Sequence, residues 1–252
     1  MRSLFHVTGL AVLLLLVGCA AKTERVGFDA EKASVANAEL GVAYLKQGKY
    51  KVAMTKLKKA IAYDEDNTNA NHYIAILYGR LEQNDLADKH FKTAIRLDEE
   101  DSAIKNNYGI FLCGMGSYEK GLKLFQDALL DPLYRDKGQA YENMGLCAEK
   151  QGNILKAENS FEEALKHNPN LPAALLGLAQ NAFDRQNIKK ASFYLARHNK
   201  IVKNKTAQSL WLDILIARKT GNKGKAGSLA IKLRNAFPDS KEAGFLKKLK
   251  IR

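Results

Sequence analysis

A 34-residue period runs through most of this 252-residue chain and limits the folds that it can adopt. Small, apolar and aromatic residues recur at fixed offsets in four successive copies: Leu40-Gly41-x-x-Tyr44 with Ala53, Leu57 and Ala60; Ile74-Ala75-x-x-Tyr78 with Ala87, Phe91 and Ala94; Tyr108-Gly109-x-x-Leu112 with Gly121, Phe125 and Ala128; and, after a two-residue insertion near Asp136 and Lys137, Met144-Gly145-x-x-Ala148 with Ala157, Phe161 and Ala164. A weaker fifth copy has Leu178, Ala179, Ala191 and Leu195, and a degenerate sixth extends to Pro238. A fixed period of this length indicates stacked structural repeats.

Each copy reads as two helices joined by a tight turn. The apolar residues follow a helical spacing, and Gln47-Gly48, Gln151-Gly152 and Thr220-Gly221 mark the turn between the helices. Gly or Ala at the eighth and twentieth positions lets the two helices approach closely, while larger residues at the seventh, eleventh and twenty-fourth positions fill the space between them. One helix pair cannot bury its apolar face alone, so successive pairs must stack.

This pattern resembles the tetratricopeptide repeat (TPR) over residues 34–240. We therefore expect an all-α fold, a right-handed superhelical solenoid of about six TPR helix pairs. Residues 241–252 carry Phe245, Leu246, Leu249 and Ile251 on a helical spacing, which predicts a C-terminal capping helix over the last repeat.

The N-terminus predicts export. A basic start at Arg2 precedes an apolar run over residues 10–17, which is far shorter than the ~20 residues that span a bilayer and is typical of a signal peptide, here residues 1–18. Leu16-Val17-Gly18-Cys19 resembles the lipobox of bacterial lipoproteins, so we expect Cys19 to be lipidated at the start of the mature chain. The alternative is an ordinary secretory signal with an incidental cysteine.

The residue after Cys19 is Ala20 and not aspartate. By resemblance to lipoprotein sorting rules, this favours the periplasmic face of the outer membrane, where acyl chains would hold the protein through ~0.8 kcal/mol per buried methylene. Residues 19–33 read as the lipidated N-terminus and a short tether.

The formal net charge of +13 would fall to +12 on removal of residues 1–18. A positive net charge of this size permits nucleic acid, anionic lipid or an acidic protein as a binding partner. We expect no nucleic-acid binding, because the predicted address is periplasmic and the lysines are scattered over every repeat. The alternative is a solvated basic surface without a dedicated ligand.

Two cysteines remain besides Cys19. Cys113 is placed near the end of the first helix of repeat three, and Cys147 is placed on the first helix of repeat four, which is its neighbour in a TPR stack. We predict a disulfide between them, since the compartment is oxidising; the alternative is two buried free thiols.

No catalytic or cofactor-binding pattern is found in the sequence. The histidines, His6, His72, His90, His167 and His198, are isolated, and none has a second ligand at metal-site spacing. The acidic pairs Glu99-Glu100 and Glu162-Glu163 read as solvated helix faces. We therefore expect a protein that is not an enzyme and has no metal or cofactor, because no stretch of ~80 residues outside the repeats could supply a catalytic domain.

First helices of TPR units line the concave face, at about the second, fifth, ninth and twelfth positions. The candidate partner-binding residues there are Val35, Ala38, Val42, Leu45, His72, Ile76, Asn106 and Ile110. An apolar groove of this kind suits an amphipathic helix or an extended peptide. One alternative for Val42 and Leu45 is that they pack under residues 28–33, which would then cap the first repeat. Asn106 and Asn107 could hold the backbone of a bound peptide, or one of them could only set the angle between repeats.

Further motifs carry a closer resemblance: Asn106-Asn107-Tyr108-Gly109 continuing into Phe111-Leu112-Cys113, Asp131-Pro132-Leu133-Tyr134, Asn143-Met144-Gly145-Leu146-Cys147 and Phe237-Pro238-Asp239-Ser240. With the lipobox and six TPRs, the whole chain resembles the PilF/PilW family, the pilotin lipoproteins of type IV pilus biogenesis. The resemblance implies a lipid-anchored monomer that binds the outer-membrane secretin and promotes its localisation and assembly, through the groove of the first repeats. The rival hypothesis is a TPR lipoprotein scaffold for cell-wall synthesis or another envelope assembly complex.

Overall fold

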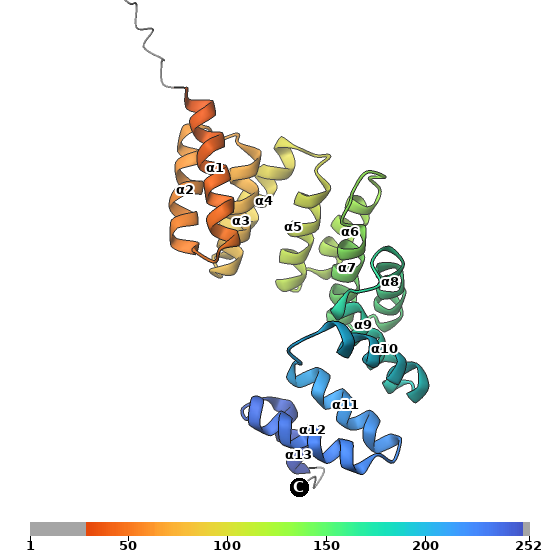
Figure 1. The fold of residues 1–252 in the computed structure, drawn as a ribbon. Helices are drawn as coiled ribbons and strands as arrows, with labels where there is room; N and C mark the ends of the chain where they lie inside the picture. Colours follow the sequence, from red (N-terminus) through yellow and green to blue (C-terminus); the bar gives the residue numbers. More distant parts are fainter. Residues whose placement is uncertain (1–28, 249–252) are drawn as a thin grey trace, which may run out of the picture.

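The computed structural model describes residues 29–248 as a curved stack of antiparallel helix pairs (Figure 1). This range contains thirteen helices and no strand: α1 (Ala30–Lys46), α2 (Tyr50–Tyr63), α3 (Thr68–Arg80), α4 (Asn84–Leu97), α5 (Ser102–Gly114), α6 (Tyr118–Leu129), α7 (Lys137–Gln151), α8 (Ile154–His167), α9 (Pro172–Asp184), α10 (Ile188–Ile201), α11 (Ala207–Lys219), α12 (Lys223–Ala236) and α13 (Lys241–Lys248). The predicted all-α solenoid of six helix pairs is confirmed. The predicted signal peptide and Cys19 lie outside the described residues.

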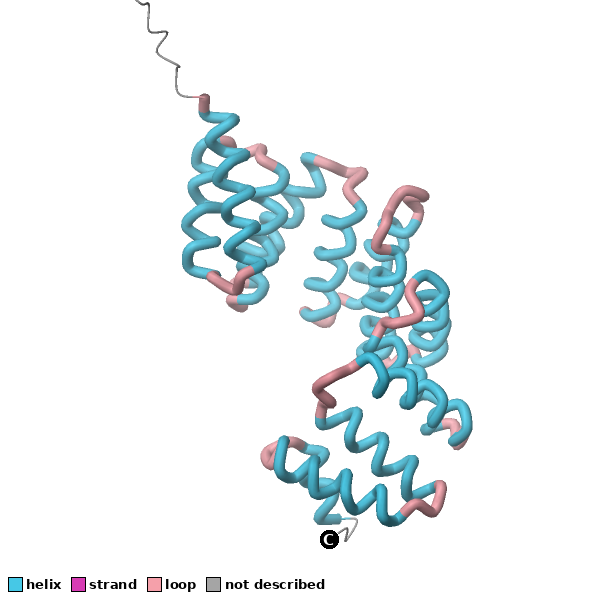
Figure 2. The backbone as a smooth tube through the Cα atoms, viewed as in Figure 1, coloured by secondary structure: helices cyan, strands magenta, loops and turns pink. Residues whose placement is uncertain are grey.

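The odd-numbered helices form one row and the even-numbered helices another. Each odd-numbered helix from α1 to α9 contacts the next odd-numbered one, whereas within residues 29–248 no even-numbered helix contacts another even-numbered helix. In a curved stack the helices of the inner row lie closer together, so the odd-numbered first helices line the concave side. Short loops join the elements, as the tube in Figure 2 shows.

Side-chain caps decide where several helices begin. The Asp29 carboxylate accepts a hydrogen bond from the backbone N–H of Lys32 at 3.0 Å, which satisfies one of the free donors of the first turn. Because of this cap α1 begins at Ala30, so residues 30–33, the last part of the predicted tether, belong to the first helix.

Large side chains fill the space inside each helix pair, as the period predicts. Phe91, Phe125 and Phe161, at the twenty-fourth position of their repeats, are fully buried. Gly145 shows why a small residue stands opposite them: a Cβ atom there would lie 2.5 Å from the Phe161 ring. A side chain at this position would push α7 away from α8.

The turn inside each repeat requires one residue with positive φ. Glycine occupies this position in four repeats, with φ between 73° and 84° at Gly48, Gly116, Gly152 and Gly221. Repeats two and five use Glu82 (φ 59°) and Gln186 (φ 61°) instead. A side chain in this left-handed region is strained, so these two turns are held by the packing of the helices around them.

The C-terminal helix covers the end of the stack. Ala243 and Leu246 on α13 are buried in one cluster with Leu210, Ile214 and Leu233 of the sixth repeat. The helix predicted to cap this repeat is therefore present over residues 241–248. None of the helices in the described part is long and apolar enough to cross a membrane.

Candidate functional site

A pocket of about 470 Å³ opens between repeats two and three on the first helices. Ile76 on α3, Ile110 and Phe111 on α5, and Met115 after α5 form much of its apolar lining. Ile110 is 44% exposed and Met115 is 48% exposed, so apolar surface faces water here. The pocket therefore offers an anchor site for an apolar side chain.

Gly79 keeps this pocket open. It lines the pocket, and a Cβ atom at this position would lie 3.2 Å from the Phe111 ring. The polar residues at the rim are Arg80, Glu82, Asn84 and Asn107. An apolar floor with a few polar groups around it suits one face of an amphipathic segment.

A second hollow of about 330 Å³ lies between the first helices of repeats one and two. Val42 lines it together with Tyr73 and Asn69, and Val35 is exposed on the same helix as Val42. Residues 30–33 belong to this helix too, so they cannot cover Val42, as the alternative hypothesis required.

Four of the eight predicted groove residues are buried inside the solenoid: Ala38, Leu45, His72 and Asn106. Ala38 packs with Ala60 and Ala70, and Leu45 belongs to the core between the first two repeats. The prediction that these four line an open groove is therefore wrong, because the fifth and twelfth positions pack within and between repeats. Val35, Val42, Ile76 and Ile110 remain accessible.

Asn106 and Asn107 both connect repeats. Asn143 Nδ2 donates to Asn106 Oδ1 at 3.1 Å, which joins repeats three and four. Asn107 Nδ2 lies 2.9 Å from His72 Nε2, which joins repeats two and three. These contacts support the alternative in which the asparagines fix the angle between repeats.

His72 is held neutral at this junction. Burial lowers its pKa to about 4, although Asp101 acts in the opposite direction. An amide nitrogen can only donate, so His72 Nε2 is the unprotonated acceptor of the Asn107 bond. Protonation would remove this acceptor and loosen the contact between repeats two and three.

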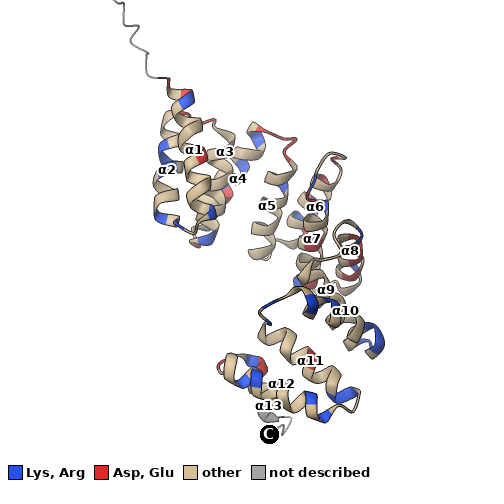
Figure 3. Cartoon of the chain, viewed as in Figure 1, with Lys and Arg blue, Asp and Glu red and all other residues tan. Residues whose placement is uncertain are grey.

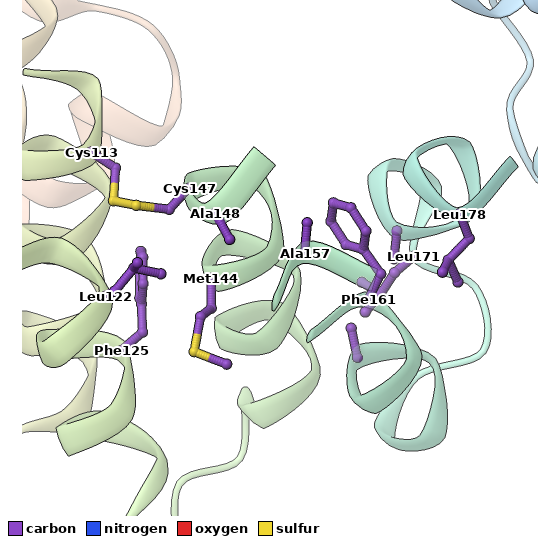
Figure 4. Close-up of a cluster of buried hydrophobic side chains, with 12 residues drawn as sticks. Cys113, Leu122, Phe125, Met144, Cys147, Ala148, Ala157, Phe161, Leu171 and Leu178 are labelled. Carbon is purple, nitrogen blue, oxygen red and sulfur yellow. A yellow bond between two sulfur atoms is a disulfide. The ribbon is translucent and has the colours of Figure 1, made fainter. Parts of the chain in front are cut away.

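A disulfide joins Cys113 on α5 to Cys147 on α7, with their Cα atoms 5.5 Å apart (Figure 4). The two sulfurs lie in a buried cluster with Leu122, Phe125 and Met144. Gly121 leaves room for the bond, because a Cβ atom there would collide with Cys113 Sγ. The crosslink ties repeat three to repeat four across the inserted loop.

The remaining polar groups make structural contacts. Within residues 29–248 no three His, Cys, Asp or Glu side chains lie close enough together to hold a metal ion. His90 Nδ1 lies 2.9 Å from Asn71 Oδ1, His167 stacks on Tyr141, and His198 lies 3.4 Å from Asn199. These side chains pack and hydrogen-bond within the solenoid.

Charge is distributed unevenly along the solenoid. The positions of the lysines in the sequence, considered alone, did not predict this difference. Residues 29–187 hold 20 basic and 23 acidic residues, whereas residues 188–248 hold 15 basic and 3 acidic residues. Figure 3 shows blue segments on α10, α12 and the loops around them, with little red between them. Lysines do occur in every repeat, but the acidic residues that balance them almost disappear after residue 187; a charge count for each repeat would have found this.

The fold and the groove define the class of protein: a TPR solenoid with an apolar, water-exposed site on its concave side. Tetratricopeptide-repeat profiles match residues 35–67, 69–101 and 148–210. Type IV pilus assembly protein PilF of Pseudomonas aeruginosa is 27% identical over 234 residues, which are 90% of this chain and 91% of the relative.

Solved structures agree with this relationship. The structure of Pseudomonas aeruginosa PilF has a TM-score of 0.81 at 26% identity, covering 87% of this chain and 98% of the relative. The structure of PilW, described as a widely conserved type IV pilus biogenesis factor, has a TM-score of 0.75 at 29% identity and covers 84% and 97%. The chain is therefore a TPR protein with strong homology to PilF and a close structural match to PilF and PilW.

Proposed function

We propose that this protein is a non-catalytic, lipid-anchored scaffold of the outer membrane that binds secretin subunits and promotes their localisation and assembly for type IV pilus biogenesis. The observation that carries the proposal is the likeness to PilF and PilW over nearly the whole chain, because both relatives are named for pilus assembly or biogenesis. The relationship extends over all six repeats.

The concave side supplies the surface that such a scaffold needs. The pocket at Ile76 and Ile110 and the hollow at Val42 lie on the successive first helices α1, α3 and α5. An amphipathic segment lying along this row could place one apolar side chain in each. Complete burial of one such side chain contributes about 1.5–3 kcal/mol before the cost of ordering the segment.

The lipid on Cys19 would make the solenoid cargo for lipoprotein sorting. A secretin subunit held in the groove would reach the outer membrane with it. Confinement on one surface raises the effective concentration of the subunits and favours their assembly into a ring.

The groove is tested with Ile110→Asp. A carboxylate in the apolar pocket must be desolvated when an apolar side chain docks, so we expect secretin capture to weaken about tenfold or more. The matched control is Leu155→Asp on α8, because Leu155 is 64% exposed and lies outside both hollows. Equal secretin capture by both variants would count against the groove, and recovery of peptidoglycan enzymes in place of secretin would favour the cell-wall alternative.

The anchor is tested separately with Cys19→Ala. Without an acyl chain the protein has no lipoprotein address, so we expect secretin monomers to accumulate in the inner membrane. Fractionation of the two membranes followed by immunoblotting for secretin measures this. Normal secretin assembly in the outer membrane would contradict the anchoring role.

A further inference from the structure

The last two repeats and α13 present a strongly basic outer surface. Two of the three acidic residues in this region are buried: Asp213 pairs with Lys205 and Lys225, and Glu242 lies 3.9 Å from Lys241. Many of the cations, by contrast, are exposed and have no ion pair among the described residues: Lys189, Lys200, Lys203, Lys223, Lys232 and Arg234.

The position of these cations separates them from the groove. Lys189 and Lys200 lie on α10, Lys223, Lys232 and Arg234 lie on α12, and Lys203 lies on the loop between α10 and α11. The helices α10 and α12 belong to the outer, even-numbered row. These six cations therefore lie on the convex side of the stack or on a connecting loop, away from the hollows of the concave site.

Exposed apolar side chains stand among the cations. Phe193 on α10 is 58% exposed and Ile231 on α12 is 52% exposed. The Arg197 guanidinium lies 5.6 Å from the centre of the Phe193 ring. Basic residues mixed with exposed aromatic and aliphatic ones are typical of surfaces that lie against a membrane interface.

We propose that this surface, formed by α10, the loop at residues 202–206 and α12, binds the anionic phospholipid headgroups of a membrane. A wide convex face matches a wide anionic surface, whereas an acidic peptide would be expected to bind in a hollow with cations around it. Each lysine or arginine near such a surface adds electrostatic attraction to the anionic headgroups, and the apolar side chains add interfacial contact. The contact lies at the opposite end of the stack from α1, so it is separate from any anchor at the N-terminus and from secretin binding.

The experiment uses the chain with Cys19→Ser, so that no acyl chain contributes to binding. Sedimentation with vesicles of phosphatidylcholine mixed with phosphatidylglycerol is compared with sedimentation with vesicles of phosphatidylcholine alone. We expect binding only to the anionic vesicles, and we expect high salt to abolish it because the interaction is electrostatic.

Two matched variants locate the surface. The combination Lys200→Gln, Lys232→Gln and Arg234→Gln should weaken binding about tenfold or more, given the contribution of each charge. The combination Lys51→Gln, Lys58→Gln and Lys89→Gln removes the same charge from the exposed outer helices α2 and α4 and should leave binding within about twofold. Circular dichroism checks that both variants remain folded.

Equal binding to neutral and anionic vesicles would overturn the proposal, and so would equal weakening by the two variants. Binding to DNA or to an acidic protein without binding to anionic vesicles would also overturn it. Secretin capture is expected to be unchanged in the Lys200, Lys232 and Arg234 variant, so a failure here is distinguishable from a failure of the proposed function.

Discussion

Repeats one to three and repeats five and six share one helical geometry, but different polar contacts hold their helices together. In the first region neutral side chains join successive repeats: Asn67 donates to Ser34 at 2.9 Å, and Asn107 contacts His72. In the last region the carboxylate of Asp213 on α11 forms ion pairs with Lys205 at 3.0 Å and with Lys225 at 2.7 Å. The comparison shows that the apolar period sets the stack, while either neutral or ionic contacts can satisfy the polar groups buried within it.

The two kinds of contact respond to pH in different ranges. His72 must stay neutral to accept its hydrogen bond. Because its pKa is lowered from 6.5 to about 4, its effect on the free energy of unfolding changes between these two pH values. Burial alone would raise the pKa of Asp213, but the hydrogen bonds from Lys225 and Lys205 outweigh it and hold the pKa below its usual value. The contribution of Asp213 is therefore present above its ordinary pKa of 3.8 and is lost as the pH falls further.

The largest effect is expected from Asp213→Ala. This change leaves Lys205 partly buried without its partner, so we expect the free energy of unfolding to fall by about 3 kcal/mol. Urea unfolding followed by circular dichroism measures the loss, and hydrogen exchange should place it in α11 and α12.

Asp66→Ala is the control for this prediction. Asp66 pairs with Arg96 at 3.1 Å, but both side chains are more than 60% exposed. Solvent screening limits such a pair to about 1 kcal/mol or less. Equal losses in the two variants would show that burial does not set the strength of the Asp213 contacts.

His72→Gln tests the neutral junction of the first region. Between pH 7.5 and pH 5 the unfolded chain takes up a proton at this position and the folded chain does not, so the histidine lowers the free energy of unfolding by about 2 kcal/mol over this range. Glutamine keeps a hydrogen-bonding side chain but does not titrate, so the variant should lose less stability on acidification. Urea unfolding at both pH values measures the difference, and identical pH dependence in the two proteins would contradict the lowered pKa.

The smallest effect is expected at the turns. Gln186→Gly relieves the positive φ in repeat five, so we expect a gain of about 1 kcal/mol in the free energy of unfolding. Gly48→Ala is the reverse change, at a turn where a Cβ atom would meet nothing within 4 Å, and should cost a similar amount. Thermal unfolding of both variants measures this, and a loss at Gln186→Gly would show that the Gln186 side chain contributes more than its backbone strain costs.

The sequence predicted only part of the candidate site correctly, because four of the eight predicted groove residues are buried. Val42, Ile76 and Ile110 were predicted in the groove and line its hollows, and the predicted pair Cys113 and Cys147 is bonded in the structure. Ala38, Leu45, His72 and Asn106 were placed there too but are buried, because a position on a repeat helix does not reveal how closely the next repeat packs on it. Gly79, at the twelfth position of repeat two, falls on the concave face that the period predicts, but Met115 was not predicted, since it contributes only through the pocket that forms between two repeats.

The sequence by itself determined the helix pairs, their order and their number, because the period fixes which residues face the partner helix and where each turn falls. It also contained the uneven charge, which is a property of composition along the chain. Only the tertiary structure decided which first-helix side chains remain open to a partner and which polar groups are consumed in joining repeats. Those outcomes depend on distances between residues about 34 positions apart, and such distances are set by packing across the whole stack.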